Sequence, residues 1–244
     1  MKNLLLATTA LVAFAGGAQA ADLGAPRSPV AAAVVAPAFN WTGFYVGAQF
    51  GYGWGAATQP WTAVVVNPVA FPNFQANARQ SGLLGGVHVG YNWQINSLVL
   101  GVVADVEASG INGNDGGSGG DVNGVRHRWN ASLRGRVGFA VDQALIYATG
   151  GFAYMNAQGT QTSRAPNEFI GFNTTGWTAG AGVEYAFTPN LTARVEYRYT
   201  DYSAKTVIFP VSGYSERIRP QIHAVRLGVS YLFSTGPSAV VARY

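Results

Sequence analysis

The residues of this chain that could do chemistry are few, and most of them are arginines and carboxylates. The sequence of 244 residues contains no Cys, which excludes thiol catalysis, disulfides and Cys-based zinc sites. His88 and Asp105 are the pair that could act as base and acid, although a His beside acids is more often a member of a hydrogen-bonded network. The motifs of zinc hydrolases, serine hydrolases and phosphate-binding loops are absent. We therefore expect no catalytic residue, no cofactor and no metal site.

The composition is that of a protein with a large apolar surface and little charge. Hydrophobic residues make up 48% of the chain and charged residues 11%, whereas an average soluble domain is about 25% charged. Past the N-terminus, no apolar run approaches the ~18 residues that a spanning helix needs. The formal net charge is +4, without a basic run that would indicate nucleic-acid binding. The chain must hide its apolar surface by some means other than a membrane-spanning helix.

The N-terminus has the pattern of an export signal. Lys2 precedes an apolar stretch, which ends in small residues and Ala18-Gln19-Ala20. That order predicts a cleavable signal peptide over residues 1–20, with an uncleaved anchor or a buried helix as the alternative. Residues 21–40 are rich in Ala, Pro and Val and predict an extended periplasmic linker. We expect the folded part to begin at Trp41.

From there onward the apolar residues recur with a period of two, which is the period of a β-strand. For example, Arg134 and Arg136 alternate with Leu133 and Val137. A slip of one residue would exchange the two faces, so the pattern specifies the register. Eight segments carry it, at residues 43–55, 83–93, 98–107, 125–139, 144–154, 177–187, 191–199 and 225–233.

The connections between these segments alternate between short and long. Short turns fall at residues 94–97, 142–143 and 189–190, and long connections fall at about 56–80, 111–124, 158–174 and 203–219. Short turns on one side and long loops on the other are typical of outer-membrane barrels. We predict an all-β fold, an eight-stranded antiparallel up-and-down transmembrane β-barrel over residues 41–233.

The polar face distinguishes this barrel from the alternative, a soluble lipocalin-like barrel with charges outside. It consists of Gly, Ser, Thr, Asn, Arg and Glu, and aromatic residues stand at both margins of the apolar face, as in membrane-interface girdles. We expect the apolar residues to form an outer coat rather than a core. In the fifth segment the faces stay open, because Leu145 and Tyr147 compete with Ile146 and Phe152 for the apolar side.

The lumen is then expected to hold the charges of the polar face. These are seven arginines and four carboxylates: Arg126, Arg128, Arg134, Arg136, Arg194, Arg198, Arg226, Asp105, Glu107, Glu184 and Glu196. An eight-stranded barrel is just wide enough for its own side chains, and charges taken out of water need partners. An ion-pair network that fills the barrel is the favoured interpretation. A narrow anion-favouring path, driven by the three extra arginines, is the alternative.

Four arginines near the long connections predict a basic rim at that end of the barrel. Arg126 and Arg128 lie near it, with Arg217 and Arg219 in the fourth long connection. Arginines bind phosphate groups as bidentate donors, so we expect this rim to face lipopolysaccharide. The outward face near the same rim is where His127 and His223 are expected.

The first long connection is apolar for an exposed loop. It contains the stretches 61–66 and 71–74, with Trp61, Phe71 and Phe74. Exposed apolar patches often mark contact sites, which keeps surface adhesion or ligand binding open as another function. The simpler interpretation is that the loop folds over the barrel mouth and buries these residues.

Several motifs resemble one known family. They are Trp41-Thr42-Gly43-Phe44-Tyr45-Val46-Gly47, Gly51-Tyr52-Gly53-Trp54-Gly55, Arg134-Gly135-Arg136-Val137-Gly138, Tyr147-Ala148-Thr149-Gly150-Gly151-Phe152-Ala153-Tyr154, Gly176-Trp177-Thr178-Ala179-Gly180-Ala181-Gly182-Val183-Glu184-Tyr185 and Arg194-Val195-Glu196-Tyr197-Arg198-Tyr199. The set is similar, in order and over most of residues 41–233, to the outer-membrane immunogenic proteins of alpha-proteobacteria. These are small porin-like surface antigens with an OmpA-like barrel.

The resemblance implies an abundant surface protein that supports envelope integrity. We predict a monomer in the Gram-negative outer membrane, with lipid, lipopolysaccharide and the outer-membrane assembly machinery as partners, and with a host or surface ligand at the loops as a further possibility. The family is not known for enzymes, so it supplies no catalytic residues. One departure is the C-terminus, where an aromatic ending at Phe233 is followed by a tail, residues 234–244.

Overall fold

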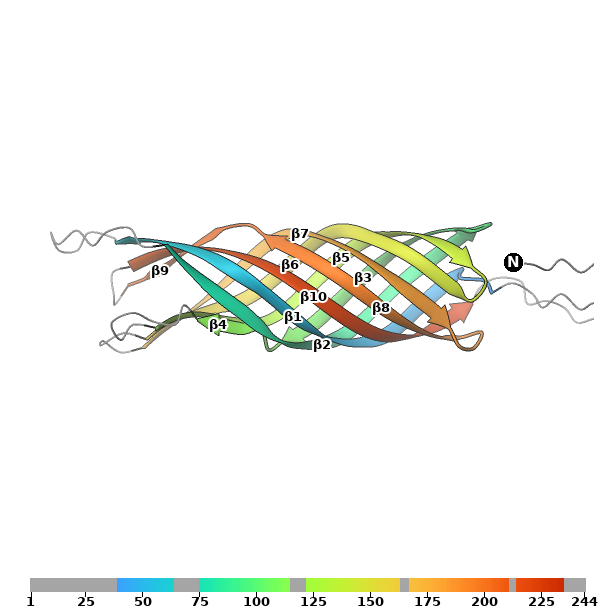
Figure 1. Cartoon of the computed structure of the whole chain (residues 1–244), viewed down its shortest axis with the longest axis horizontal. Coiled ribbons are helices and arrows are strands. Elements are labelled where there is room, and N and C mark those ends of the chain that lie inside the picture. Colours follow the sequence, from blue (N-terminus) through green and yellow to red (C-terminus); the bar gives the residue numbers. More distant parts are fainter. Residues whose placement is uncertain (1–38, 64–74, 115–121, 163–166, 211–213, 235–244) are drawn as a thin grey trace, which may run out of the picture. The chain divides into compact units, whose positions relative to one another are not determined.

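The computed structural model describes residues 39–63, 75–114, 122–162, 167–210 and 214–234. These residues are almost entirely β-strand, wound into a tilted cylinder (Figure 1). The strands are β1 Gly43–Ala63, β2 Gln75–Ile95, β3 Leu98–Ser109, β4 Asn112–Asn114, β5 Val122–Val141, β6 Ala144–Thr162, β7 Glu168–Ala186, β8 Leu191–Tyr202, β9 Lys205–Phe209 and β10 Tyr214–Ser234. Within these ranges no helix is long and apolar enough to cross a bilayer.

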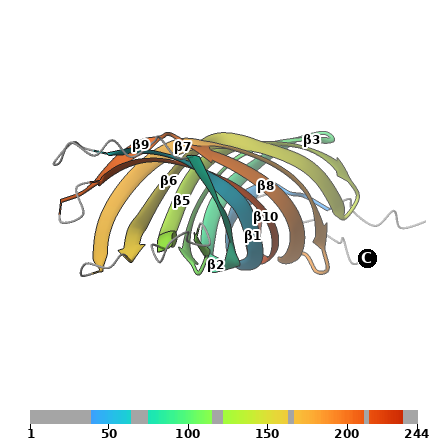
Figure 2. The ribbon, with the colours of Figure 1, turned by 60° about the vertical axis from the view of Figure 1, so that its left-hand side comes forward.

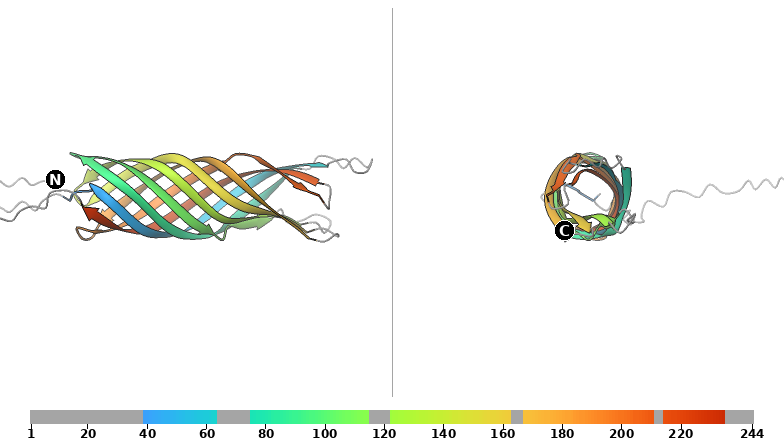
Figure 3. Two further views of the ribbon diagram at one scale, coloured as in Figure 1. Left: turned by 180° about the vertical axis from the view of Figure 1, so that it is seen from behind. Right: turned by 90° about the vertical axis from the view of Figure 1, so that its left-hand side faces the viewer.

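The sheet closes on itself, because β1 pairs with β2 on one side and with β10 on the other. The closed ring is visible in the end-on view (Figure 3). β4 continues β3, and β9 continues β8, so ten assigned strands make a ring of eight. All pairings are antiparallel, and closure leaves no open sheet edge in the bilayer. The predicted eight-stranded antiparallel barrel is confirmed.

The three predicted short turns are confirmed. β2 ends at Ile95 and β3 begins at Leu98, and the other two turns join β5 to β6 and β7 to β8. Asn96 and Asp142 have φ of 55° and 51°. Asn and Asp tolerate this left-handed conformation better than other residues with a side chain, which explains their place in these turns.

The four long connections are shorter than predicted, because the strands extend far into them. β1 runs to Ala63 and β2 starts at Gln75, and the residues predicted for the fourth loop, Arg217 and Arg219, lie within β10. The apolar stretches predicted for the first loop lie at the end of β1 and outside the described residues. A strand of 21 residues with a rise of about 3.3 Å and a tilt of about 45° spans about 50 Å of height. The apolar band of a barrel is about 25 Å tall, so strands of this length extend well beyond such a band. Figure 2 shows the long strands running on into the hairpins.

Alternation places the large apolar side chains outside, as predicted. In β2, Leu83 is 70% exposed and His88 is 1% exposed. In β6, where the sequence left the faces open, Leu145 and Tyr147 point inward whereas Ile146 and Phe152 point outward. The outside of the barrel is therefore the apolar coat.

Inward-facing glycines make room for large side chains on the neighbouring strands. A Cβ on Gly90 of β2 would lie 2.4 Å from the ring of Tyr45, and a Cβ on Gly182 of β7 would lie 2.7 Å from the hydroxyl of Tyr147. Real Cβ atoms do not approach so closely. The glycines on the polar face are thus needed for the side chains that lie across them.

The inside also contains apolar layers, and here the expectation of an outer coat alone is wrong. Near the short turns, one buried cluster consists of Trp41, Val99, Ala140, Leu145, Tyr147 and Ala186. Near the long hairpins, a larger cluster consists of Ala57, Leu84, Ile111, Val125, Ala153, Met155, Ala157, Phe172, Tyr202, Val207, Phe209, Ile218, Ile222 and Ala224. The reason is that the barrel is longer than its charged layer, so both ends of the lumen are packed with apolar side chains.

Candidate functional site

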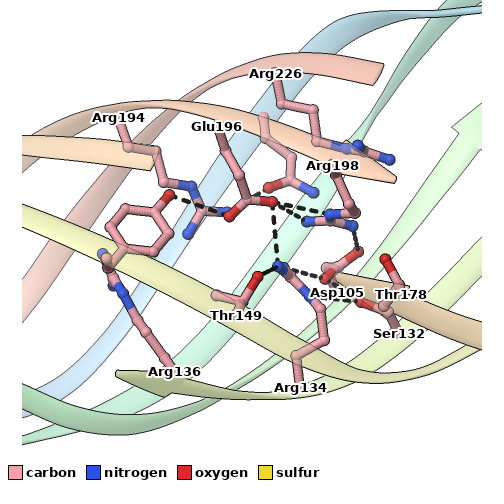
Figure 4. Close-up of polar contacts among 12 residues, drawn as sticks. Asp105, Ser132, Arg134, Arg136, Thr149, Thr178, Arg194, Glu196, Arg198 and Arg226 are labelled. Carbon is pink, nitrogen blue, oxygen red and sulfur yellow. Dashed lines mark hydrogen bonds and ion pairs between the residues drawn. The ribbon is translucent and has the colours of Figure 1, made fainter. Parts of the chain in front are cut away.

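Between the two apolar layers lies a layer of charged side chains from β3, β5, β7, β8 and β10 (Figure 4). It contains nine residues of the predicted lumen: Asp105, Glu107, Arg134, Arg136, Glu184, Arg194, Glu196, Arg198 and Arg226. All nine are buried, and each projects inward because it alternates with a lipid-facing neighbour. The structure brings them into one network.

Its centre is a ring of two arginines and two carboxylates. Arg134 Nη2 lies 2.9 Å from Asp105 Oδ2, and Arg134 Nη1 lies 3.1 Å from Glu196 Oε1. On the other side, Arg198 lies 3.0 Å from Asp105 Oδ1 and 2.7 Å from Glu196 Oε1. Each carboxylate is shared by two guanidinium groups. This arrangement offsets the repulsion between the arginines. Two of the four bonds, Arg134 to Glu196 and Arg198 to Asp105, run between strands that are not neighbours in the sheet.

A second group joins β10 to β3 and β1. Arg226 donates from Nε and Nη2 to Glu107, at 2.9 and 3.0 Å. Gln49 donates from Nε2 to Glu107 Oε1 at 2.7 Å and accepts a bond from Arg194. Gln49 is a partner that the sequence analysis missed. Its position on the inward face of β1 was the available signal.

A third group lies toward the short turns. Arg136 is paired with Glu184, which also accepts a bond of 2.5 Å from Thr192. The guanidinium of Arg136 stacks on the ring of Tyr147, 3.8 Å from the centroid. The Tyr147 hydroxyl in turn donates to Glu196 Oε2 at 3.1 Å, which connects this group to the central ring.

Two of the seven arginines predicted for the lumen are not in it. β5 has a bulge between His127 and Trp129, where one residue is added against β6. An extra residue inverts the alternation, so Arg126 and Arg128 are exposed on the outside, and His127, predicted outside, is buried. His127 Nε2 lies 2.7 Å from Gln80 Oε1. The layer therefore has five arginines against four carboxylates, rather than seven against four.

The candidate acid–base pair is not assembled. His88 is opposite Asp105 in the register of β2 and β3. However, His88 Nε2 lies 2.8 Å from Ser230 Oγ, and the Asp105 carboxylate is occupied by Arg134, Arg198 and Ser132. In the parts of the chain that the structure describes, no cluster of three His, Asp or Glu side chains could hold a metal.

A second group of cations lies on the outside, just beyond the aromatic margin on the long-hairpin side. Six exposed side chains form this basic rim: Arg79, Arg126, Arg128, Lys205, Arg217 and Arg219. One of them, Arg219, is paired with a carboxylate, that of Asp201, at 2.8 Å. The sequence pattern does not predict Arg79 and Lys205 as members of the rim, because it ends the strands before them, whereas they lie in β2 and β9. His223, predicted on this face, is there, with Tyr197 Oη 2.6 Å from its Nδ1.

The family model for the outer membrane protein beta-barrel domain matches residues 7–233. The chain belongs to this family. It is 32% identical over 244 residues to the 31 kDa outer-membrane immunogenic protein of Brucella melitensis biotype 1, with 96% of this chain and 100% of that protein covered. It is 34% identical over 201 residues to the 22 kDa outer membrane protein of Rhizobium leguminosarum bv. viciae, with 82% of each covered. The family and these relatives place the chain in the outer membrane.

Among solved structures, the barrel is similar to the outer membrane protein OprG from Pseudomonas aeruginosa, with a TM-score of 0.49 and 9% sequence identity over 80% of this chain and 98% of that one. It is also similar to Neisserial surface protein A, with a TM-score of 0.38 and 16% identity over 79% of this chain and 98% of that one. The resemblance to outer-membrane immunogenic proteins, inferred from the ordered motifs, is confirmed.

Proposed function

We propose that this outer-membrane protein is a structural barrel with a sealed lumen, which supports the envelope and passes no solute. One observation carries the proposal: the charged layer is crossed by ion pairs and lies between two apolar layers. A hydrated ion would have to enter apolar packing twice and break buried ion pairs between those steps.

The alternative of a narrow anion-favouring pore is weakened by the same geometry. That alternative depended on three surplus arginines, and the bulge in β5 removes Arg126 and Arg128 from the lumen. The layer keeps a surplus of one cation, in Arg194, which is bonded to Gln49 and faces Glu184 across the β7–β8 pair. The candidate pair of His88 and Asp105 is not assembled, and we also propose that the protein is not an enzyme.

We further propose that the basic rim binds the phosphate groups of lipopolysaccharide. Six exposed cations gather just beyond the apolar coat, and one of them, Arg219, is paired with Asp201. The layer next to the apolar coat on the outer surface is where anionic headgroups lie, and guanidinium groups match phosphate geometry. A barrel that binds lipopolysaccharide molecules around its rim would stabilise the outer leaflet near it.

The ends of the chain, which lie mostly outside the described residues, complete this proposal. Residues 1–20 act as a cleaved export signal, residues 21–40 as a periplasmic linker and residues 234–244 as a tail, whose first residue, Ser234, is the last residue of β10. Insertion by the assembly machinery would then give a monomer, because in the described chain the eight-stranded ring closes and leaves no strand edge within the apolar band for a second copy.

A deletion strain tests the structural role. Loss of the protein should make cells more sensitive to detergent, and expression of the intact chain should restore resistance. A strain with full detergent resistance that has lost binding to a host surface would contradict the structural role. That result would favour recognition through the loops.

A further inference from the structure

We propose that the outer face of β10 binds one phosphorylated disaccharide headgroup at a defined site, with one anionic group on each side of Gln221. The ligand is a glycolipid of the lipid A class with two phosphates. This inference rests on the proposed contact between the basic rim and lipopolysaccharide. It goes further, because it assigns the contact to one wall of the barrel and to one headgroup.

The first half of the site is a hollow of about 620 Å³ at the break between β8 and β9. Its lining is Trp177, Asp201, Tyr202, Ser203, Ala204, Arg217, Arg219 and Gln221. Asp201 accepts two bonds from Arg219, at 3.1 Å to Nε and 2.8 Å to Nη2, which hold the guanidinium at the edge of the hollow. Arg217 is exposed and adds a second positive charge there.

The second half is a hollow of about 530 Å³ on the other side of Gln221. It is lined by Trp54, Gly55, Ala56, Arg79, Gln80, Ser81, Gln221 and His223. The rings of Trp54 and His223 stack, with 17° between their planes. Because Tyr197 engages Nδ1 of His223, Nε2 is the ring nitrogen left to bond a ligand.

The two hollows are side by side because they share Gln221. In the register, Ala56 of β1 is opposite both Gln221 of β10 and Arg79 of β2. Arg79 therefore lies at the same height as Gln221 and two strands away from it, at about 10 Å. Arg219 lies two residues from Gln221 on β10, at about 7 Å along the strand. The two arginines are about 12 Å apart at their Cα atoms. Because Asp201 holds the guanidinium of Arg219, that separation suits a ligand with two anionic groups at opposite ends better than a single phosphate.

The aromatic rings give the site its preference for a sugar. Trp54 and Trp177 are 40% and 51% exposed, one in each hollow. Aromatic faces pack against apolar surfaces and leave the ring edge wet, which suits a sugar ring at the membrane interface. Directly below on β10, Val225, Leu227 and Val229 are exposed as a stripe that acyl chains would cover.

The opposite wall provides a matched control. Arg126 and Arg128 line a hollow of about 350 Å³ with Ser109 and Gln158, and no aromatic ring lines it. Arg126 and Arg128, like Arg79 and Arg219, are exposed and belong to the basic rim. If the contact were purely electrostatic, removal of either pair would weaken lipid binding equally.

Binding of purified lipids to the refolded full-length mature barrel tests the site, by native mass spectrometry in detergent. The probes are bisphosphorylated lipid A, monophosphorylated lipid A and inorganic phosphate. The variants are Arg79→Gln/Arg219→Gln, Arg126→Gln/Arg128→Gln and Trp177→Ala, each checked for heat-modifiable gel mobility. We expect about tenfold weaker binding of bisphosphorylated lipid A by the first and third variants, and less than about threefold change in the control.

Each other outcome overturns the site in a distinguishable way. An equal loss in both double variants would mean that the rim binds lipid A without a defined site. Equal affinity for the two forms of lipid A, or for inorganic phosphate, would remove the requirement for two anionic groups. If the unaltered barrel binds no lipid A, the proposed rim contact fails together with the site.

Discussion

Replacement of Arg134 by Ala should lower the free energy of unfolding by about 3–5 kcal/mol, the cost of removing one partner from a buried ion pair. Arg134 is bonded to Asp105, Glu196, Thr149 and Ser132, and its side chain is 0% exposed. The substitution leaves both carboxylates with one guanidinium instead of two. Urea unfolding of the barrel in lipid vesicles, followed by tryptophan fluorescence, measures the loss.

The matched control for Arg134 is Arg126→Ala on the same strand. Arg126 is exposed beyond the bulge, so its loss should change the free energy of unfolding by less than about 0.5 kcal/mol. Equal effects of the two substitutions would mean that the lumenal ion pairs do not stabilise the fold. In that case, whether the bulge places an arginine inside or outside the barrel would not affect its contribution to the free energy of unfolding.

Replacement of Trp41 by Ala should cost about 3–5 kcal/mol as well, for a different reason. Trp41 is 1% exposed inside the short-turn end of the barrel, and its ring contacts Phe39 edge to face at 4.7 Å. Its backbone N–H also donates to Gln94 Oε1 at 2.7 Å. Removing the indole leaves a cavity in a closed cylinder, which cannot collapse to fill it.

The same unfolding measurement applies to Trp41, with Trp41→Phe as the comparison. A Phe keeps part of the apolar contact, so this variant should lose clearly less than Trp41→Ala. If Trp41→Ala unfolded at the urea concentration of the unaltered barrel, the apolar layer at this end would not be a packed part of the fold.

Much of the fold could be predicted from the sequence because one physical pattern determines it. Lipid covers one side of every strand, so apolar residues must recur with a period of two. The same pattern placed Arg134, Arg136 and Glu184 inside correctly. The pattern failed at His127, because a bulge adds one residue and so exchanges the two faces of the strand. The alternation in the flanking sequence does not indicate that extra residue.

The alternating pattern also could not predict the apolar layers inside the barrel. Leu145 and Tyr147 point inward in β6, whereas Ile146 and Phe152 point outward, and all four are apolar or aromatic. A segment that is apolar on both faces has no period to read. That ambiguity was itself the signal that the lumen is not polar along its whole length.

The partners in the charged layer depend on the curvature of the whole barrel. Glu184 and Arg194 are opposite each other in neighbouring strands, which local pairing predicts. Arg134 and Glu196 come from β5 and β8, and Arg226 and Glu107 from β10 and β3. Such contacts cross the lumen, and the stagger of the closed sheet decides which side chains meet.

Planar-bilayer recording of the purified barrel tests the sealed lumen most directly. Insertion is verified by heat-modifiable gel mobility of the same preparation. We expect no steady conductance steps from the unaltered barrel, because the ion pairs of the charged layer and the two apolar layers close the lumen. A steady, anion-selective conductance that falls in Arg134→Ala would contradict the account and show that the lumenal arginines form a path.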